Sequence, residues 1–173
     1  MSNDDWVGDF KSLYERAVDR YREGRQSARS MFEPAEVEFL GSIGCTAQEL
    51  FDFVEDGVHA GEPSFEEVLA VTGIRRNYFL NELGGKTADR IVHTSELPPK
   101  SEAVDGIRWL PRILEKAKAK LNGQLSEDLM YGCGGDRPFL RSVHIGLAEF
   151  LEKVRDSKDD REVIDFVKSR AGG

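Results

Sequence analysis

The sequence contains no apolar run of the roughly eighteen residues that a membrane-spanning helix requires, so we predict no transmembrane segment. It has only two cysteines, Cys45 and Cys133, too few for a disulfide framework. Its three histidines show no His-x-x-x-His spacing, so we expect neither a metal site nor a cofactor. The first six residues are acidic and lack the apolar core of a signal peptide. These absences favour a cytoplasmic protein with reduced thiols and no membrane partner.

An excess of positive charge is also missing. The chain has 24 Lys and Arg against 32 Asp and Glu, and residues 1–100 carry the whole surplus of acid, with 11 against 19. Residues 101–173 are balanced at 13 against 13. Nucleic-acid binders and proteins that bind anionic membranes depend on clustered cations. We therefore predict no nucleic-acid partner. The hydrophobic fraction of 39% is that of an ordinary globular protein.

What the sequence does have is helical periodicity. Apolar residues recur at three- and four-residue steps, and no convincing alternating strand occurs, so the predicted class is all-α. Capping boxes at residues 46–49 and 64–67 each begin a helix. Further helices are predicted over about 5–24, 35–43, 75–83, 87–93, 109–123, 136–143, 147–156 and 160–170. Residues 94–101, with Pro98 and Pro99, are predicted as a loop.

The two halves of the chain resemble each other. A shift of 100 residues aligns 10–54 with 110–154 without a gap and keeps the apolar positions in phase. The identical pairs include Glu15 with Glu115, Leu40 with Leu140, and Glu49 with Glu149. We interpret this as two tandem pseudo-repeats of about four helices each, although helices that share a period can also align by chance. The expected division is a first repeat at 1–73, a connector at 74–104 and a second repeat at 105–173, packed as one compact helical bundle.

Two motifs in the second half resemble a bacterial family of unknown function (number 5069). The first is Gly106 to Arg112, a Gly-hydrophobic-x-x-Leu-Pro-Arg entry to a long helix. The second, which we call the elbow, covers residues 130–140 and contains Tyr131, Cys133 and Asp136. The resemblance extends over about 97–168, with a degenerate copy near the N-terminus that lacks the Cys and Asp of the elbow. It implies no activity, because the family brings none.

The elbow is the best candidate for a site. Its glycines permit unusual backbone conformations, and Asp136 stands at a predicted helix N-terminus. Cys133, Asp136 and His144 are candidate catalytic residues, because a thiol beside a helix N-terminus and a cation favours the thiolate. Arg112, Tyr131 and Arg137 are candidate ligand-binding residues. The alternative is a tight turn with a buried, inert thiol and a capping carboxylate.

A basic stripe precedes the elbow. Arg108, Arg112, Lys116 and Lys120 advance by four residues along the helix that leads to Gly123, whose predicted start is Trp109 or, alternatively, Asp105. Such a stripe can grip a phosphate or an acidic partner, but it is more typical of the solvated face of an amphipathic helix. The leading hypothesis is a binding or regulatory module for a protein partner or a small anionic ligand, with its groove between the repeats. The alternative is an enzyme or redox sensor that uses Cys133 with Asp136 and Arg112.

Overall fold

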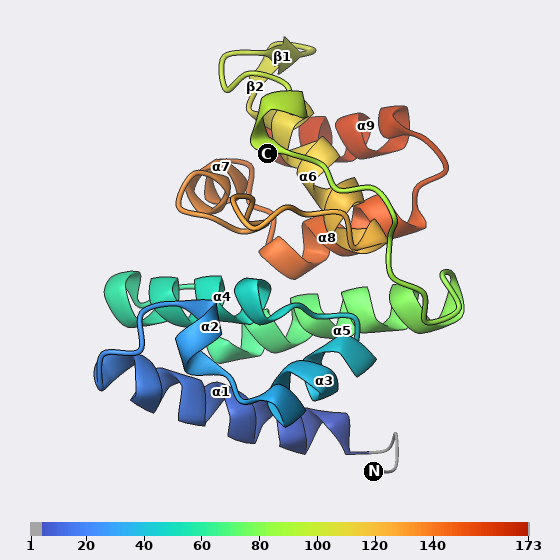
Figure 1. Cartoon of the computed structure of the whole chain (residues 1–173). Helices are drawn as coiled ribbons and strands as arrows, with labels where there is room; N and C mark the ends of the chain where they lie inside the picture. The colour runs from blue at the N-terminus through green and yellow to red at the C-terminus, as the bar shows by residue number, and fades with distance from the viewer. Residues whose placement is uncertain (1–4, 173) are drawn as a thin grey trace.

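The computed structural model describes residues 5–172, and these residues form a mainly helical fold, as predicted. The N-terminal half contributes α1 (Trp6–Arg22), α2 (Ala28–Met31), α3 (Pro34–Ser42), α4 (Ala47–Ala60) and α5 (Phe65–Asn81). The C-terminal half contributes α6 (Leu110–Asn122), α7 (Asp136–Ser142), α8 (Leu147–Asp156) and α9 (Asp160–Ala171). Figure 1 shows the two halves as stacked layers, with α4 and α5 facing α7 and α8.

The core is continuous through both layers. Helix α5 packs against α6 and α8, and α1 packs against α4. Apolar side chains from both halves join one buried cluster, which includes Phe10, Leu40, Leu50, Ile113 and Phe150. Burial of such side chains is the main favourable contribution to folding, so the two halves stabilise each other.

Helix α5 differs from its prediction. We expected two helices, after the capping box at 64–67 and over 75–83, with a domain boundary after residue 73. The structure has one helix through this point, because Gly73 interrupts the apolar pattern without breaking the backbone. The Trp6 ring lies 3.7 Å from where a β-carbon on Gly73 would stand, so α1 packs against α5 at this glycine. The predicted boundary thus falls inside a helix.

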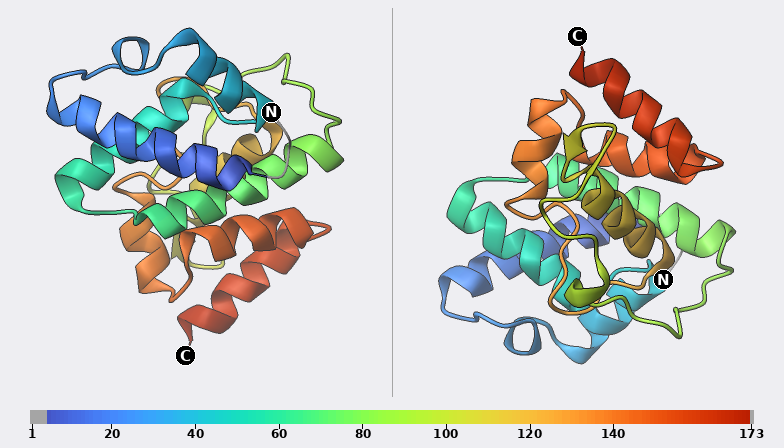
Figure 2. Two further views of the ribbon diagram at one scale, coloured as in Figure 1. Left: turned by 90° about the horizontal axis from the view of Figure 1, so that it is seen from below. Right: turned by 90° about the horizontal axis from the view of Figure 1, so that it is seen from above.

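The connector also differs. The helix predicted over 87–93 is absent, because the backbone of Val92 pairs with another segment instead. Val92 N–H donates to Gln124 O at 2.7 Å, and Ser126 N–H donates to Val92 O at 3.2 Å. The predicted loop at 94–101 contains a 3-10 turn, Thr94–Glu96. Figure 2 shows this connector crossing the outside of α6 on its way between the halves.

A small hairpin was missed in the sequence. Strands β1 (Ala103–Val104) and β2 (Ile107–Arg108) pair antiparallel around Asp105 and Gly106. Both turn residues have positive φ, 50° and 80°, as a two-residue hairpin turn requires. An Asp-Gly pair between apolar residues was the signal for it.

The halves share local geometry at equivalent positions. Cys45 N–H donates to Leu40 O at 2.9 Å, and Ile145 N–H donates to Leu140 O at 3.1 Å. Gly44 and His144 both take positive φ at the ends of α3 and α7. These correspondences agree with tandem repeats, and the duplication itself stays a prediction.

Candidate functional site

The carboxylate of Asp136 is the centre of the elbow, and it is completely buried. Its Oδ2 accepts hydrogen bonds from Lys116 Nζ at 2.7 Å and from Gly132 N–H at 2.9 Å. Its Oδ1 accepts a third from Trp109 Nε1 at 2.9 Å. A buried carboxylate needs such donors to remain charged. Asp136 is therefore the structural hub of the elbow rather than a free acid or base.

The glycines of the elbow make room for this arrangement. A β-carbon on Gly135 would lie 2.4 Å from the Trp109 ring, and one on Gly132 would lie 2.6 Å from Leu147. Trp109 itself has a φ of 74°, unusual for a large side chain. Its bond to Asp136 and the close contact with Gly135 hold it there.

The side chains of Arg137 and Tyr131 are also held in hydrogen bonds within the protein. Arg137 Nη1 donates to Gly132 O at 2.7 Å and to Asp56 Oδ2 at 2.6 Å, so it joins the elbow to α4. The buried Tyr131 hydroxyl donates to Leu147 O at 2.7 Å. Burial, together with the nearby Asp136, raises the pKa of Tyr131 well above its usual value. Neither side chain is left free to hold a ligand.

Arg112 and His144 lie apart from the thiol. Arg112 is only 8% exposed and donates to Pro98 O at 3.0 Å, which fastens the connector to α6. His144 is exposed at the end of α7, where it occupies the position that Gly44 has in the first half. The structure therefore brings together Cys133 and Asp136 but adds neither Arg112 nor His144 to them.

Lys116 is the partner that the sequence reasoning left out of the candidate site. Its Nζ lies 3.2 Å from Cys133 Sγ as well as 2.7 Å from Asp136. The first half has an equivalent pair, because Arg16 Nη2 lies 3.2 Å from Glu36 Oε1. The first half has neither a Cys nor an Asp at the positions of the elbow, but Glu36, 100 residues before Asp136, supplies a carboxylate there. A cation and a carboxylate separated by the same interval in both halves were the available signal.

The prediction of a solvated basic stripe was wrong for three of its four members, whereas Arg108 is exposed and lies in β2 rather than on α6. Arg112, Lys116 and Lys120 are buried, because α6 is covered by the connector, α5 and α8. Lys120 Nζ donates to Glu49 Oε1 of α4 at 2.8 Å, an ion pair between the halves. Although burial opposes it, Lys120 keeps the pKa of Glu49 below its usual value.

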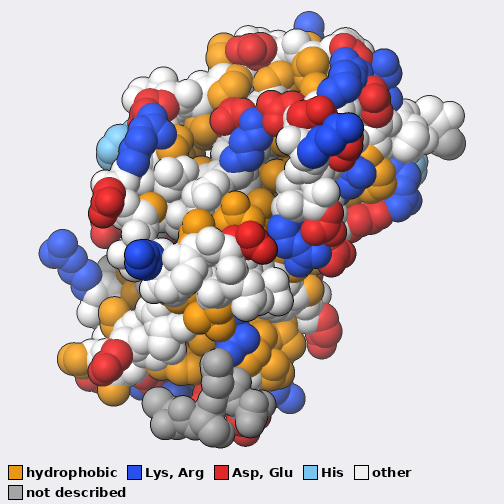
Figure 3. Space-filling model, turned by 90° about the vertical axis from the view of Figure 1, so that its right-hand side faces the viewer, with side chains coloured by type: hydrophobic (Ala, Val, Ile, Leu, Met, Phe, Trp, Pro, Cys, Tyr) orange, Lys and Arg blue, Asp and Glu red, His pale blue; other side chains and the backbone are white. Residues whose placement is uncertain are grey.

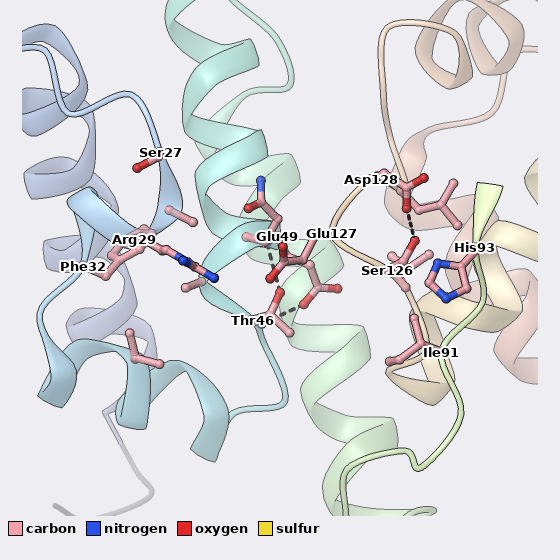
Figure 4. A pocket seen from close by; sticks show the side chains of 16 residues that line it. Ser27, Arg29, Phe32, Thr46, Glu49, Ile91, His93, Ser126, Glu127 and Asp128 are labelled. Carbon is pink, nitrogen blue, oxygen red and sulfur yellow. Dashed lines mark hydrogen bonds between the residues drawn. The ribbon is translucent and has the colours of Figure 1, made fainter.

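A cavity lies between the two halves, away from the elbow. We call it the interhalf cleft, and it has a volume of about 1020 Å³. One wall comes from residues in 27–32, Val37 and the start of α4 at 46–49, and the other from Ile91, His93 and 125–129. Figure 4 shows Arg29 reaching in from one wall, with Ser126, Asp128 and His93 on the other. No residue of the elbow is among those that line this cleft.

Carboxylates outnumber cations around the interhalf cleft. Glu49, Glu127 and Asp128 line it, against Arg29 and His93. Hydrogen bonds from Ser126 and Thr94 hold the pKa of Asp128 below its usual value, so it stays ionised. The lining is otherwise largely apolar, with Phe32, Val37, Ile91, Leu125 and Leu129.

Asp52 lies one helical turn from this lining. Its Oδ1 accepts a hydrogen bond of 2.8 Å from Gln48, which is part of the cleft wall. Burial raises its pKa to about 7, against the effect of Gln48, and the neighbouring Glu55 and Asp56 add to the rise. Burial and the acidic neighbours therefore both disfavour the charged form of this carboxyl.

Comparison with known families bears on the C-terminal half. Residues 96–172 match the family described as Domain of unknown function (DUF5069). This confirms the resemblance predicted for 97–168. No curated protein and no solved structure matches the chain.

The DUF5069 match includes α6, the elbow and residues 125–129 of one wall of the interhalf cleft, whereas Ile91, His93 and the whole of the other wall lie outside it. Within residues 5–172, no group of three or more His, Cys, Asp and Glu side chains is arranged to hold a metal ion. No helix in this range is long and apolar enough to cross a membrane. Figure 3 shows exposed charges of both signs intermixed on one face.

Proposed function

We propose that the protein is a binding module whose interhalf cleft receives a segment of a protein partner that carries apolar side chains beside Lys or Arg. The observation that carries this proposal is the placement of exposed apolar residues. Among residues 5–172, the large apolar side chains that are well exposed are Val7, Val37 and Ile91, at 43%, 44% and 42%. Two of these three line the cleft, one on each wall. Exposed apolar surface at a cavity is typical of binding sites.

The charges favour a basic partner. Glu127 and Asp128 line the cleft as exposed carboxylates, in addition to Glu49, which Lys120 already pairs. Residues 1–100, which supply all of one wall, carry the acidic surplus of the chain. Charge complementarity mainly accelerates association and excludes partners of the wrong sign. The cations that we first assigned to an anionic ligand, Arg112 and Arg137, do not line the cleft. A small anion is therefore less well supported than a basic, apolar segment.

The reduced state of the thiols supports a cytoplasmic location as part of this proposal. Cys45 and Cys133 are both free in the structure. Free thiols are typical of proteins from reducing compartments.

Calorimetry with a model ligand tests the proposal. The probe is a helical peptide of leucine and lysine, and the control peptide has glutamate in place of lysine. We expect the lysine peptide to bind and Ile91→Ser to weaken binding by about 5- to 10-fold, the value of burying the part of this side chain that is exposed in the free protein. Val7→Ser is the matched control, because Val7 is equally exposed but lies on α1 outside the cleft.

Charge is tested in the same way. Glu127→Gln removes an exposed cleft carboxylate, and Glu15→Gln removes an exposed carboxylate on α1. Binding that weakens for Glu127→Gln alone supports the proposal. Equal effects of both variants, or equal binding of the glutamate peptide, would show that the attraction is non-specific and contradict it.

A further inference from the structure

Cys133 and Lys116 form a contact that the binding proposal does not use. Lys116 Nζ lies 3.2 Å from Cys133 Sγ, and the lysine side chain is 4% exposed. Cys133 is only partly buried, so this residue, unlike Cys45, is in contact with solvent. The Lys116 amine is thus in contact with the thiol of a partly exposed cysteine and is held in place by its ion pair with Asp136.

The other cysteine lacks these features. Cys45 is buried, and its thiol donates to Thr46 O at 3.4 Å. Burial raises the pKa of Cys45 to about 12, which keeps it protonated and unreactive. The chain therefore contains its own control for thiol chemistry.

We propose that Cys133 and Lys116 are an oxidative modification site, at which a peroxide converts the thiol–amine contact into a covalent sulfur–nitrogen bond. In the first step the thiolate attacks a peroxide oxygen, the O–O bond breaks, and Cys133 becomes a sulfenic acid. The hydroxide that leaves from hydrogen peroxide takes up the proton that the Cys133 thiol lost when the thiolate formed, so the other product is water. Sulfur is oxidised and the peroxide is reduced, so no further oxidant is needed.

The second step joins the two side chains. Lys116 transfers one ammonium proton to the Asp136 carboxylate, 2.7 Å away, and its nitrogen lone pair attacks the sulfenic sulfur. The S–N bond forms and the S–O bond breaks, and the hydroxide leaves with a second nitrogen proton as water. A sulfenamide results, a known product of sulfenic acids with protein nitrogen.

The surroundings of Lys116 favour the S–N bond, because its formation leaves no unpaired charge in the buried elbow. Before the reaction a buried cation faces a buried anion, and afterwards both groups are neutral. A buried charge without a partner is strongly unfavourable, so a proton acceptor beside the amine removes that obstacle. In the first half, Arg16 and Glu36 stand at the equivalent positions with Glu33 in place of the thiol, so the reaction is confined to the second half.

Mass spectrometry of the intact protein tests the proposal. After treatment with hydrogen peroxide, we expect a loss of about 2 Da that a thiol reductant reverses, since one S–N bond replaces an S–H and an N–H. Peptide mapping should join the segment containing Lys116 to that containing Cys133. Cys45→Ser should retain the loss, and Cys133→Ser should abolish it.

Lys116→Arg separates the two steps, because it keeps a cation for Asp136 without a primary amine. It should stop at a sulfenic acid that dimedone traps. If this variant does not fold, the peptide map of the unaltered protein still decides. Oxygen adducts or disulfide dimers alone, without a peptide that joins residues 116 and 133, would overturn the proposal.

Discussion

The Lys116 ammonium on α6 lies 2.7 Å from the Asp136 carboxylate on α7, and their side chains are 4% and 0% exposed. A second ion pair on the same helix, between Lys118 and Asp160, is 2.8 Å long but much more exposed. The two pairs have the same chemistry and differ in burial. They provide a matched test of whether the elbow is a structural hub.

Asp136→Asn should reduce the free energy of unfolding by about 3–5 kcal/mol, because it leaves the Lys116 charge buried without a partner. Asp160→Asn should change it by less than about 1 kcal/mol, the usual contribution of an exposed pair. Urea denaturation followed by circular dichroism measures both. Similar small losses would show that the elbow does not depend on this pair.

Two adjacent glycines of the elbow should differ sharply. Gly135→Ala places a methyl group 2.4 Å from the Trp109 ring, and overpacking of this kind costs about 1–3 kcal/mol. At Gly134 the nearest atom would be 3.9 Å away, so Gly134→Ala should be nearly neutral. Chemical denaturation, followed by tryptophan fluorescence, compares them. Equal stability would contradict the observed packing of Trp109.

The sequence predicted the helical class and most helix positions, because apolar periodicity and capping boxes are local signals. It failed for the basic stripe, since the partners of Lys116 and Lys120 lie 20 and 71 residues away in sequence. Long lysine stems also pack well in apolar surroundings when their charged ends are paired. A single helix pattern cannot identify such partners.

The candidate site was predicted only in part. The elbow was identified from its glycines and its Cys and Asp, and the structure places Cys133 and Asp136 together. The interhalf cleft was not predicted, because its walls come from segments that are distant in sequence and carry no motif of their own. One wall depends on the backbone pairing of Val92 with residues 124–126. No local sequence pattern predicts that pairing.

Asp52 should make stability depend on pH. Its pKa of about 7 in the folded protein exceeds the value of about 3.9 for an unfolded chain, so the folded state favours the protonated form. Stability from this group therefore falls as pH rises from about 4 to 7. Asp52→Asn should raise the free energy of unfolding by about 1–2 kcal/mol at pH 8. This value is smaller than the full pKa shift implies, because solvent screens a partly exposed carboxyl. The gain should vanish near pH 4, where Asp52 is protonated in both states.

The pKa of Asp128 is shifted in the opposite direction from that of Asp52, so its effect on stability should have the opposite pH dependence. Its pKa is lowered in the folded protein, so its contribution is present at neutral pH and is lost as the pH falls through its folded pKa. Asp128→Asn should therefore reduce stability at neutral pH. Thermal denaturation over a range of pH measures both variants, and a gain for Asp52→Asn that did not depend on pH would refute the assignment.

His144 should be replaceable without loss. Its φ of 57° is unfavourable for a residue with a side chain, so His144→Gly should stabilise the fold by about 0.5 kcal/mol. The reverse exchange, Gly44→His, should destabilise it, because the new β-carbon would lie 2.8 Å from Phe79. Denaturation measures both, and a marked loss of stability for His144→Gly would reveal a contact that the structure does not show.

The location of ligand binding tests the central claim most directly. In an NMR titration of the protein with the leucine–lysine peptide, the account predicts that amide shifts concentrate at Val37, Thr46 to Glu49, Ile91 and 125–129. The Asp52 carboxyl resonance should report a lower pKa as basic groups approach. Shifts that concentrate on α1 around Val7, or at the elbow with the cleft unchanged, would contradict the assignment of the interhalf cleft as the binding site.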